Sequence, residues 1–300
     1  MGNKKITSEN TKLVIAISSR ALFNLDHSHK IFKEEGIEAY ARHQQENEHV
    51  VLEPGVGFTL VKKLLKLNSK KTPIDVILLS RNSADTGLRI FNSIEHYDLN
   101  ISRAAFTRGE STHPFVGAFE ADLFLSSNYN DVQKALQSGY AAASIVESKS
   151  NNSHPSQLRI AFDGDAVIFS DEAERIFQEK GLEAFHENEI QSEKIELKAG
   201  PFKSFLVSLQ KIQSTFPEEN NPIRTALVTA RSAPSHRRVI HTMREWGIRI
   251  DESFFLGGLE KGVFLKQFAA DIFFDDQQQH CESASQYVPT GHVPSGIKNS

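Results

Sequence analysis

The stretch LRIAFDGDAVIFSDEAERIFQEKGLEAF, residues 158–185, has a near twin earlier in the chain. Residues 13–40 read LVIAISSRALFNLDHSHKIFKEEGIEAY, and 11 of the 28 pairs are identical when the two are aligned without a gap. Asp163 and Asp165 of the later copy face Ser18 and Arg20 of the earlier one. The same segment therefore occurs twice, once with two acidic residues and once without them.

The similarity continues in the same order along the chain, as an internal duplication requires. The block PIDVILLSRNS (73–83) matches PIRTALVTARS (222–232). Further on, FEADLFLSS (119–127) matches FAADIFFDD (268–276). Because the blocks keep their order, we interpret them as two copies of one ancestral unit.

Two tandem lobes follow from this duplication, residues 10–147 and residues 155–298, joined by the polar linker ESKSNNSHPSQ (147–157). In each lobe, short apolar runs that indicate buried strands alternate with helical patterns. This alternation predicts an α/β fold in which each lobe is Rossmann-like and has a parallel sheet covered by helices. The expected strands are residues 14–17, 76–79 and 122–125 in the first lobe and 159–162, 226–228 and 271–274 in the second.

Helical patterns separate these strands. Gly36 and Gly181 end the first pattern of each lobe, where glycine favours a left-handed cap. Residues 172–213 form a longer segment than a plain crossover needs, so we expect a small cap there that closes over a substrate and excludes water. The other expected helices are residues 58–67, 86–97, 202–212 and 235–246.

The bulk composition is that of a soluble globular protein, with 39% hydrophobic and 24% charged residues. A net charge of −4 argues against a general nucleic-acid binder, and no apolar run approaches the ~18 residues that a membrane span needs. The opening MGNKKITSEN lacks the apolar core of a secretory signal. A single cysteine, Cys281, fits a reducing cytoplasm, and we interpret it and the adjacent His280 as ordinary surface residues.

Reactive side chains follow the three expected strands of the second lobe. The first strand ends in Asp163-Gly164-Asp165, and Lys261 follows a Gly-Gly turn and is expected to open a helix. Because ligands of parallel sheets bind beyond the carboxyl ends of the strands, these side chains are expected to converge. The other strand ends carry Thr229, Ala230 and Arg231, and then Asp275 and Asp276.

This set suits phosphoryl transfer. Asp163 is held at a strand end for in-line attack on phosphorus, which would give an aspartyl-phosphate. Asp165 would protonate the leaving alkoxide and then deprotonate the attacking water. The Thr229 hydroxyl and the Lys261 ammonium would hold the phosphoryl oxygens, with Ala230 and Arg231 beside them.

A carboxylate that attacks a phosphate dianion needs a cation to offset the repulsion. Magnesium prefers oxygen ligands, which the carboxylates of Asp163 and Asp275 would supply. Asp165 would contribute its backbone carbonyl, and Asp276 would orient a metal-bound water. Taken singly, each motif has an ordinary structural interpretation, such as a solvated Asp-Gly-Asp turn, but their joint placement at strand ends does not.

A receiver-type signalling domain also combines acids, Thr and Lys around magnesium. In that arrangement the acidic pair follows the first strand, and a lone phosphorylated Asp precedes the Thr. Here the pair Asp275-Asp276 comes last, and no lone Asp precedes Thr229 at a central strand end. The order of the motifs therefore disfavours a signalling domain.

The four motifs resemble those of the haloacid dehalogenase superfamily, which run Asp-x-Asp, Ser/Thr, Lys and an acidic pair. More closely, the chain resembles the cytosolic type I 5′-nucleotidases through AISSRALF, NSIEHYDL, QLRIAFDGDAVIFSDE, GPFKSFL, IRTALVTARSA and FFDDQ. This resemblance implies magnesium-dependent hydrolysis of nucleoside 5′-monophosphates in the cytosol, with AMP favoured. TRGES (107–111) stands where the family has a TGGNS-like stretch, so Arg108 and Glu110 replace a neutral pair.

The first lobe lacks the reactive set and is therefore expected to be catalytically silent. It carries Ser80 for Thr229, and it also has Thr112 for Lys261 and Ser126-Ser127 for the acidic pair. We expect it to pack against the active lobe and help shape the substrate pocket. Its candidate substrate contacts are Arg20, Asn82 and Arg108, although these side chains could equally serve only the structure, and a regulatory nucleotide is an alternative ligand of this lobe.

In the expected cap, Lys203 and either Phe202 or Phe205 are candidate nucleoside contacts, with core packing the alternative for the two rings. Two other functions remain open beside the nucleotidase. One is a phosphatase of the same superfamily acting on sugar phosphates, and the other is a non-catalytic nucleotide-binding regulator. The sequence also leaves a homo-oligomer open.

Overall fold

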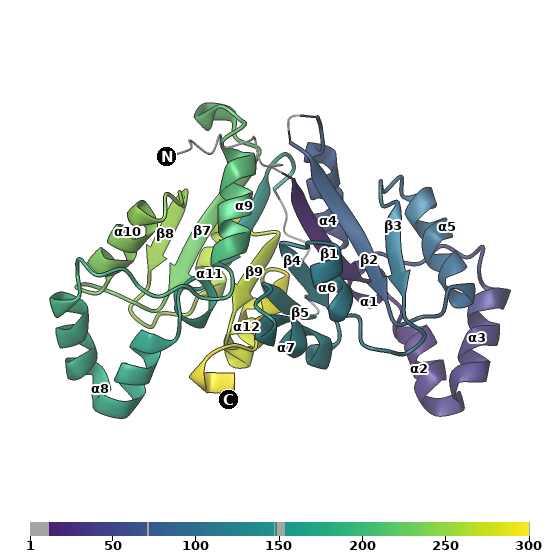
Figure 1. The fold of residues 1–300 in the computed structure, drawn as a ribbon, viewed down its shortest axis with the longest axis horizontal. Coiled ribbons are helices and arrows are strands. Elements are labelled where there is room, and N and C mark those ends of the chain that lie inside the picture. Colours follow the sequence, from purple (N-terminus) through teal and green to yellow (C-terminus); the bar gives the residue numbers. More distant parts are fainter. Residues whose placement is uncertain (1–11, 71, 147, 149–153, 300) are drawn as a thin grey trace, which may run out of the picture.

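The computed structural model describes residues 12–70, 72–146, 148 and 154–299 (Figure 1). Residues 10, 11 and 147 of the predicted first lobe lie outside this range. Residues 147 and 149–153 of the predicted linker also fall outside it.

The described strands form one ten-stranded sheet in the order β3-β2-β1-β4-β5-β10-β9-β6-β7-β8. All neighbouring strands run parallel except β5 and β10, which pair antiparallel at the centre. The strands are β1 (Leu13–Ser18), β2 (Ile74–Ser80), β3 (Arg103–Phe106), β4 (Leu123–Ser126), β5 (Ala142–Val146), β6 (Leu158–Phe162), β7 (Ile223–Thr229), β8 (Glu252–Phe255), β9 (Ile272–Asp275) and β10 (Thr290–His292).

This mostly parallel sheet confirms the α/β class, but the two separate sheets that the sequence predicted are replaced by one. The five strands of each half keep the same spatial order, since β3-β2-β1-β4-β5 corresponds to β8-β7-β6-β9-β10. The pairing of β5 with β10 joins the two sets. The sequence interpretation contained neither of these strands, so the junction could not be foreseen.

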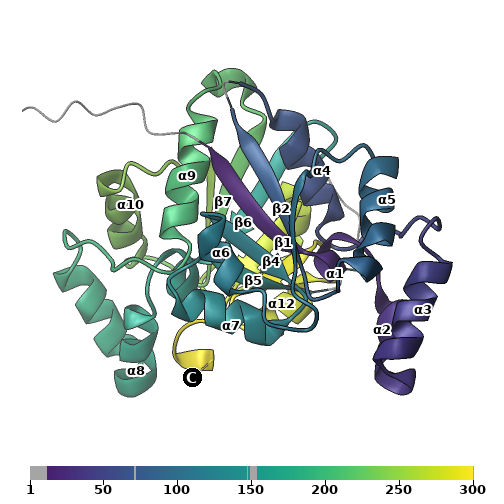
Figure 2. The ribbon, with the colours of Figure 1, turned by 45° about the vertical axis from the view of Figure 1, so that its right-hand side comes forward.

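Within each half, helices connect successive strands, and the helices cover both faces of the sheet (Figures 1 and 2). The expected helices 58–67, 86–97, 202–212 and 235–246 correspond to α4, α5, α9 and α10. The helices are α1 (Ser19–Leu22), α2 (Asp26–Glu35), α3 (Ile37–Glu46), α4 (Phe58–Leu67), α5 (Leu88–His96), α6 (Pro114–Ala118), α7 (Tyr129–Gln137), α8 (Glu172–Gln191), α9 (Lys203–Gln213), α10 (His236–Glu245), α11 (Gly262–Phe268) and α12 (Gln278–Ala284).

The hydrophobic core is shared between the two halves on one face of the sheet only. Alternate residues of a strand point to opposite faces, so Ile15 and Ile17 join one cluster while Val14 and Ala16 join another. The cluster with Ile15 is continuous under both halves, whereas the opposite face carries two separate clusters. The division into lobes at 10–147 and 155–298 therefore stays a prediction, because one core spans the boundary.

Helices α4 and α9 each pack on a strand of the other half, α4 on β6 and α9 on β1. Ser208 of α9 donates to Asp122 at 2.7 Å, and the Asp122 carboxylate also accepts from the backbone N–H of Val14. In the equivalent place, the Lys63 ammonium of α4 lies 2.7 Å from the Asp271 carboxylate. Each half thus places one aspartate, half-buried Asp122 or buried Asp271, directly before a strand and binds it to a helix of the other half.

Substituting Lys63→Met is expected to lower the free energy of unfolding by about 2–4 kcal/mol, because it removes the ammonium that lies 2.7 Å from the buried Asp271 carboxylate. Lys63 also donates to the backbone carbonyls of His154 and Gln157, which would lose a donor. Urea denaturation measures the change. Lys66→Met, on an exposed position of the same helix, is the control and should cost less than about 0.5 kcal/mol. Equal midpoints for the two variants would contradict the assignment.

Two helical hairpins protrude from the same side of the molecule, α2 with α3 in the first half and the bent helix α8 in the second (Figure 1). Gly36 separates α2 from α3 with φ of 88°, and Gly181 bends α8 with φ of 83°. Both values lie in the left-handed region that favours glycine. The predicted cap over residues 172–213 is not confirmed, because its second part, α9, belongs to the core, where Phe202 and Phe205 are fully buried.

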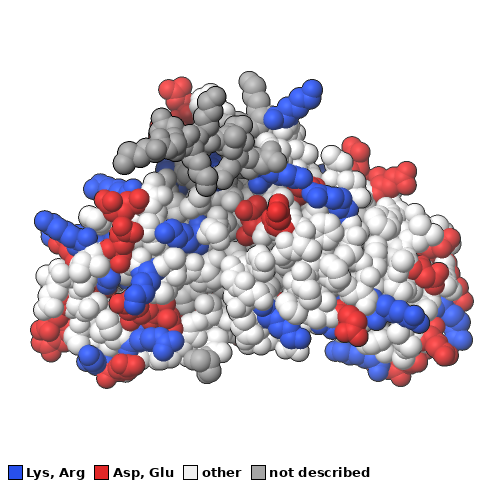
Figure 3. Space-filling view, in the orientation of Figure 1, with Lys and Arg blue, Asp and Glu red and all other residues white. Residues whose placement is uncertain are grey.

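On the face seen in Figure 3, acidic and basic side chains are interspersed, and neither sign forms a continuous field. Among the described residues, no helix combines the length and the apolar character needed to cross a membrane.

Candidate active site

Three neighbouring strands of the second half bring the predicted catalytic residues to one edge of the sheet. Asp163 follows β6, Thr229 ends β7 and Asp275 ends β9, and β6 lies between the other two. The Asp163 backbone N–H donates to the carbonyl of Phe274 at 2.8 Å, which fixes Asp163 beside Asp275. The convergence expected from the order of the motifs is therefore present.

Gly164 allows the Asp-Gly-Asp turn to pack directly on Thr229. A Cβ atom at Gly164 would lie 3.3 Å from the Thr229 hydroxyl oxygen, which is tighter than ordinary contacts. The Gly164 N–H donates to the Asp163 carboxylate at 2.7 Å. Glycine therefore allows the close approach of the turn to β7, and a larger residue would require Thr229 to shift by a few tenths of an ångström.

Lys261 precedes α11 and bridges two buried carboxylates. Its ammonium lies 3.0 Å from Asp163 and 2.6 Å from Asp275. Burial alone would lower the pKa of Lys261, but Asp163 and Asp275 raise it overall, so the ammonium stays charged. Burial would raise the pKa of Asp275, yet Lys261 and His280 lower it to about 2.

The acids of the cluster would carry more negative charge when ionised than the single ammonium of Lys261 can neutralise. Burial raises the pKa of Asp163 to about 7, against the opposing effect of Lys261. Burial and the nearby carboxylates of Asp163 and Asp275 raise the pKa of Asp276 to about 9. Both carboxylate oxygens of Asp276 are buried, and neither has a hydrogen-bond partner among the described residues. A hard divalent cation fits this set, because it would favour the ionised carboxylates and use their oxygens.

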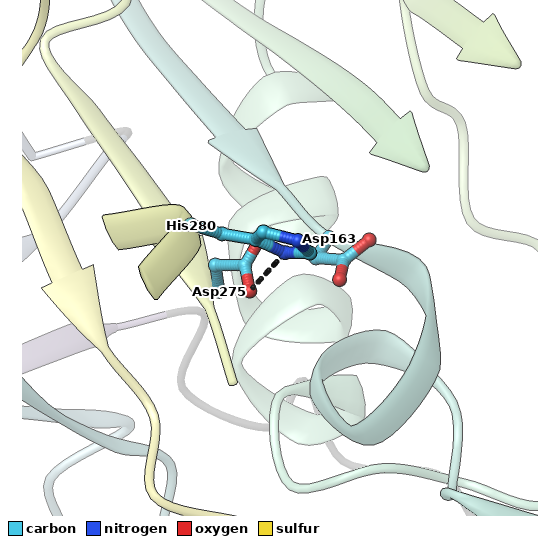
Figure 4. A group of neighbouring side chains, drawn as sticks. All are labelled: Asp163, Asp275 and His280. Carbon is cyan, nitrogen blue, oxygen red and sulfur yellow. Dashed lines mark ion pairs between the residues drawn. The ribbon is translucent and has the colours of Figure 1, made fainter. Parts of the chain in front are cut away.

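Asp163, Asp275 and His280 each offer a ligand atom, and these atoms all lie within 4.8 Å of one another (Figure 4). The Nδ1 atom of His280 lies 3.3 Å from the Asp275 carboxylate. The sequence interpretation of Cys281 as a surface residue is wrong, whereas the His280 side chain is 39% exposed. His280 faces the site from α12, and Cys281 is fully buried, with its thiol against the Asp275 carbonyl. The position of His280 in the helix directly after the acidic pair was the signal available in the sequence.

Asp165 is held by a network of buried ions. Arg231 donates to both of its carboxylate oxygens, at 2.7 and 2.8 Å. The same guanidinium donates to Glu189 of α8 at 2.5 Å, and Glu189 also accepts from Arg238 at 2.9 Å. Burial would lower the pKa of Arg231, but Asp165 and Glu189 raise it. Arg231, predicted to bind phosphate, therefore has its guanidinium engaged by two carboxylates. No sequence pattern indicated the second of these, Glu189.

The other predicted site residues lie in different surroundings. Ala230 is exposed directly after β7. The Lys203 ammonium lies 4.0 Å from the centre of the Trp246 ring, so it is placed over an indole. Phe202 and Phe205 pack against Phe162 in the core, which is the alternative interpretation of these two rings.

Arg20, Asn82 and Arg108 line a separate cavity of about 820 Å³, whose lining comes from residues 18–131 and includes none of the acids of the second half. It lies where the first half places its own strand ends, and these carry hydroxyl groups. Ser80 ends β2 and contacts Ser19 at 3.0 Å. That the first half is catalytically inactive remains a prediction. The role of Arg20, Asn82 and Arg108 in substrate binding also remains a prediction.

Comparison with known proteins gives a consistent result. A family model described as 5′-nucleotidase matches residues 5–300. Human cytosolic 5′-nucleotidase 1B is 40% identical over 288 residues, which cover 91% of this chain and 47% of that protein. The chain thus spans about half the length of this curated relative. A search of solved structures found no match.

The family match covers almost the whole chain, including the half that lacks the acids. The identity to the human protein extends over both halves as well. These findings confirm the resemblance to the cytosolic type I enzymes, and the chain belongs to the 5′-nucleotidase family.

Proposed function

We propose that this chain is a magnesium-dependent 5′-nucleotidase of the cytosol that hydrolyses nucleoside 5′-monophosphates, with AMP favoured. The observation that carries the proposal is the meeting of Asp163, Thr229, Lys261 and Asp275 at one sheet edge. Membership of the 5′-nucleotidase family supports the substrate class, and the name of the human relative supports the cytosolic setting.

In the first chemical step, an oxygen of Asp163 bonds to phosphorus while the bond from phosphorus to the 5′ oxygen breaks. Asp165 gives its proton to that oxygen, so the nucleoside leaves as an alcohol. In the second step, Asp165 takes a proton from water, and the water oxygen bonds to phosphorus. The bond to Asp163 then breaks, inorganic phosphate leaves, and both carboxyl groups return to their starting state.

Lys261 and Thr229 stabilise the phosphoryl oxygens in both steps. Lys261 is buried and charged, so its ammonium interacts strongly with charge that develops nearby. Arg231 is a positioning residue, because it holds both oxygens of Asp165 and ties them to Glu189 of the protruding hairpin. Movement of α8 would therefore change the orientation of the acid–base group.

Asp163 and Asp275 would hold magnesium, with the Asp165 backbone carbonyl as a further ligand and Asp276 orienting a bound water. When bound, the ion supplies positive charge that offsets the repulsion between the phosphate dianion and the carboxylates. The two oxygens of Asp276 that lack a partner among the described residues fit this arrangement.

A panel of nucleoside monophosphates and sugar phosphates, assayed for released phosphate, tests the proposal. AMP with magnesium should be turned over, and a chelator should lower the rate at least about 100-fold, because the acids then repel the substrate. Sugar phosphates should give at least about tenfold lower kcat/KM. Equal turnover of sugar phosphates would favour the broader phosphatase. Absence of phosphate release from every compound would favour the non-catalytic regulator.

A further inference from the structure

The cavity of about 820 Å³ in the first half lies at the carboxyl ends of the strands that correspond to the catalytic ones. Its floor includes Ser19 and Ser126, and the hairpin of α2 and α3 forms one wall. Its volume lies within the range of small-molecule sites. Five strand spacings separate β1 from β6, about 24 Å at the usual 4.8 Å, so one mononucleotide does not reach both sheet edges.

The ionic network around Asp165 has a counterpart in this cavity with altered charges. Where the catalytic half links Glu189 to Arg231, the first half has Gln44 and Asn82 at the aligned positions. The Arg231 guanidinium lies over Phe185, and the aligned Tyr40 touches Asn82.

Every acid of the catalytic edge is replaced by a neutral or basic side chain. The counterparts of the metal-binding acids are serines, and Arg20 stands where the catalytic half has Asp165. Two cations, Lys261 and Arg231, are also replaced by neutral residues. Because more carboxylates than cations are lost, the local charge becomes more positive. The catalytic edge needs a metal ion to accept a phosphate dianion, but this edge does not.

The hydrogen-bond network of the cavity fixes the orientation of the Asn82 amide. Arg89, which can only donate, donates to the Gln44 side-chain oxygen at 3.2 Å. Gln44 therefore uses its NH₂ to donate to the Tyr40 hydroxyl, and that hydroxyl donates to the Asn82 oxygen, both at 2.9 Å. The Asn82 NH₂ group remains as a buried donor that has no partner among the described residues.

Like the Asn82 NH₂ group, the Nε–H group of Arg20 is a donor without a partner among the described residues. The Nε atom is buried, and Arg20 also lines the cavity. Arg108 is exposed at the rim, and its backbone N–H bonds to the Asn82 carbonyl at 3.0 Å. The acids of the lining are Glu38, Asp85 and Asp131. Asp131 is paired with Arg81 through both oxygens, and Asp85 accepts a hydrogen bond from Gln45. Donors in a cavity that lack a protein partner are available to a ligand or to water.

The opposite wall is apolar and aromatic. Phe32 and Tyr40 meet edge to face at 6.0 Å, and His29 stacks on Phe32 at 6.1 Å. Phe32 is 44% exposed, which is high for a large aromatic side chain. A planar ring bound beside the donors would cover this surface.

We propose that this cavity binds a nucleoside monophosphate without hydrolysing it, with the phosphate at Asn82 and Arg20 and the base against Phe32 and Tyr40. Ser18, which replaces the nucleophile, is used within the chain, because its oxygen accepts from the N–H groups of Ala21 and Ser127. The bound ester therefore meets no carboxylate nucleophile. This inference does not depend on the proposed activity, because it concerns binding in the other half.

Equilibrium dialysis of labelled AMP against full-length Asp163→Asn protein, with chelator present, tests the proposal without turnover. Asn82→Asp keeps the size of the side chain and its acceptor for Tyr40, but it adds a negative charge beside the phosphate. It should weaken AMP binding at this cavity at least about tenfold. Arg20→Ala is the second variant, because the Arg20 guanidinium makes an exposed ion pair with Asp26 and no other ion pair among the described residues. Arg42→Ala, an exposed arginine of α3 outside the cavity, is the matched control and should change the Kd less than about twofold.

The same dialysis with ribose 5-phosphate, inorganic phosphate and adenosine separates the parts of the ligand. Weaker binding of ribose 5-phosphate than of AMP supports recognition of the base by the aromatic wall. Binding of AMP that neither Asn82→Asp nor Arg20→Ala weakens would overturn the proposal. Adenosine binding as tight as that of AMP would also overturn it, because the donors would then have no role. If Asn82→Asp fails to fold by circular dichroism, Arg20→Ala decides the question.

Discussion

Phosphate release from AMP is expected to fall at least about 10⁴-fold in kcat when Asp163 is replaced by Asn. The amide has nearly the same shape, so it can keep the hydrogen bond from Gly164, but it is a poor nucleophile toward phosphorus. It also removes one of the two carboxylates that would hold magnesium. Loss of kcat with a folded protein would therefore reflect the chemistry of the carboxylate rather than its packing.

Ser18→Ala is the matched control, because Ser18 occupies the aligned position at the end of β1. If the first half takes no part in the reaction, this variant should keep kcat within about threefold of the parent. Steady-state assays with both proteins, each checked by circular dichroism, give the comparison. A large loss of kcat in folded Ser18→Ala, or full activity of Asp163→Asn, would refute the assignment of the nucleophile.

The second large effect is expected at Asp165. Asp165→Asn should lower kcat for AMP by about 10²- to 10⁴-fold, because the leaving alkoxide then has no proton donor. With 4-nitrophenyl phosphate, whose phenolate leaves without protonation, formation of the aspartyl-phosphate should be nearly unchanged. A burst of nitrophenol followed by slow turnover is therefore expected, since the second step still lacks its base.

Stopped-flow absorbance measures this burst directly. Glu183→Gln, at an exposed position of α8, serves as the control and should retain parental rates with both substrates. If Asp165→Asn slowed the burst as strongly as it slowed the release of phosphate from AMP, Asp165 would act through the position of Asp163 rather than as a proton donor. Its two hydrogen bonds to Arg231 make that comparison necessary.

The sequence alone was sufficient to identify the residues that meet at the candidate catalytic edge. Parallel strands end at the same edge of a sheet, so the reactive side chains at the ends of three apolar runs, acids at two and Thr229 at the third, had to converge if those runs formed neighbouring strands. The duplication added a second line of argument, because the strand ends of the first half carry serines in aligned positions. The same local patterns located α4, α5, α9 and α10 within a few residues.

Other features depend on contacts between distant segments. The pairing of β5 with β10 joins the halves into one sheet, but β10 has only three residues and no pattern that marks its partner. Helix α9 reads as an amphipathic helix whether it covers a substrate or a core. Only its packing on β1, a strand of the other half, places it in the core.

The side chains of the candidate site also divide into those that the sequence predicts and those that only the packing places there. The sequence predicts the residues that strand ends and a turn position, namely Asp163, Thr229, Lys261 and Asp275. His280, Glu189 and the NH₂ group of Asn82, which has no partner among the described residues, could not be predicted in this way, because each depends on which helix surface faces the sheet edge. Local sequence specifies strands, turns and the residues at their ends, whereas the partners of a side chain across helices are set by long-range packing, which no short segment encodes.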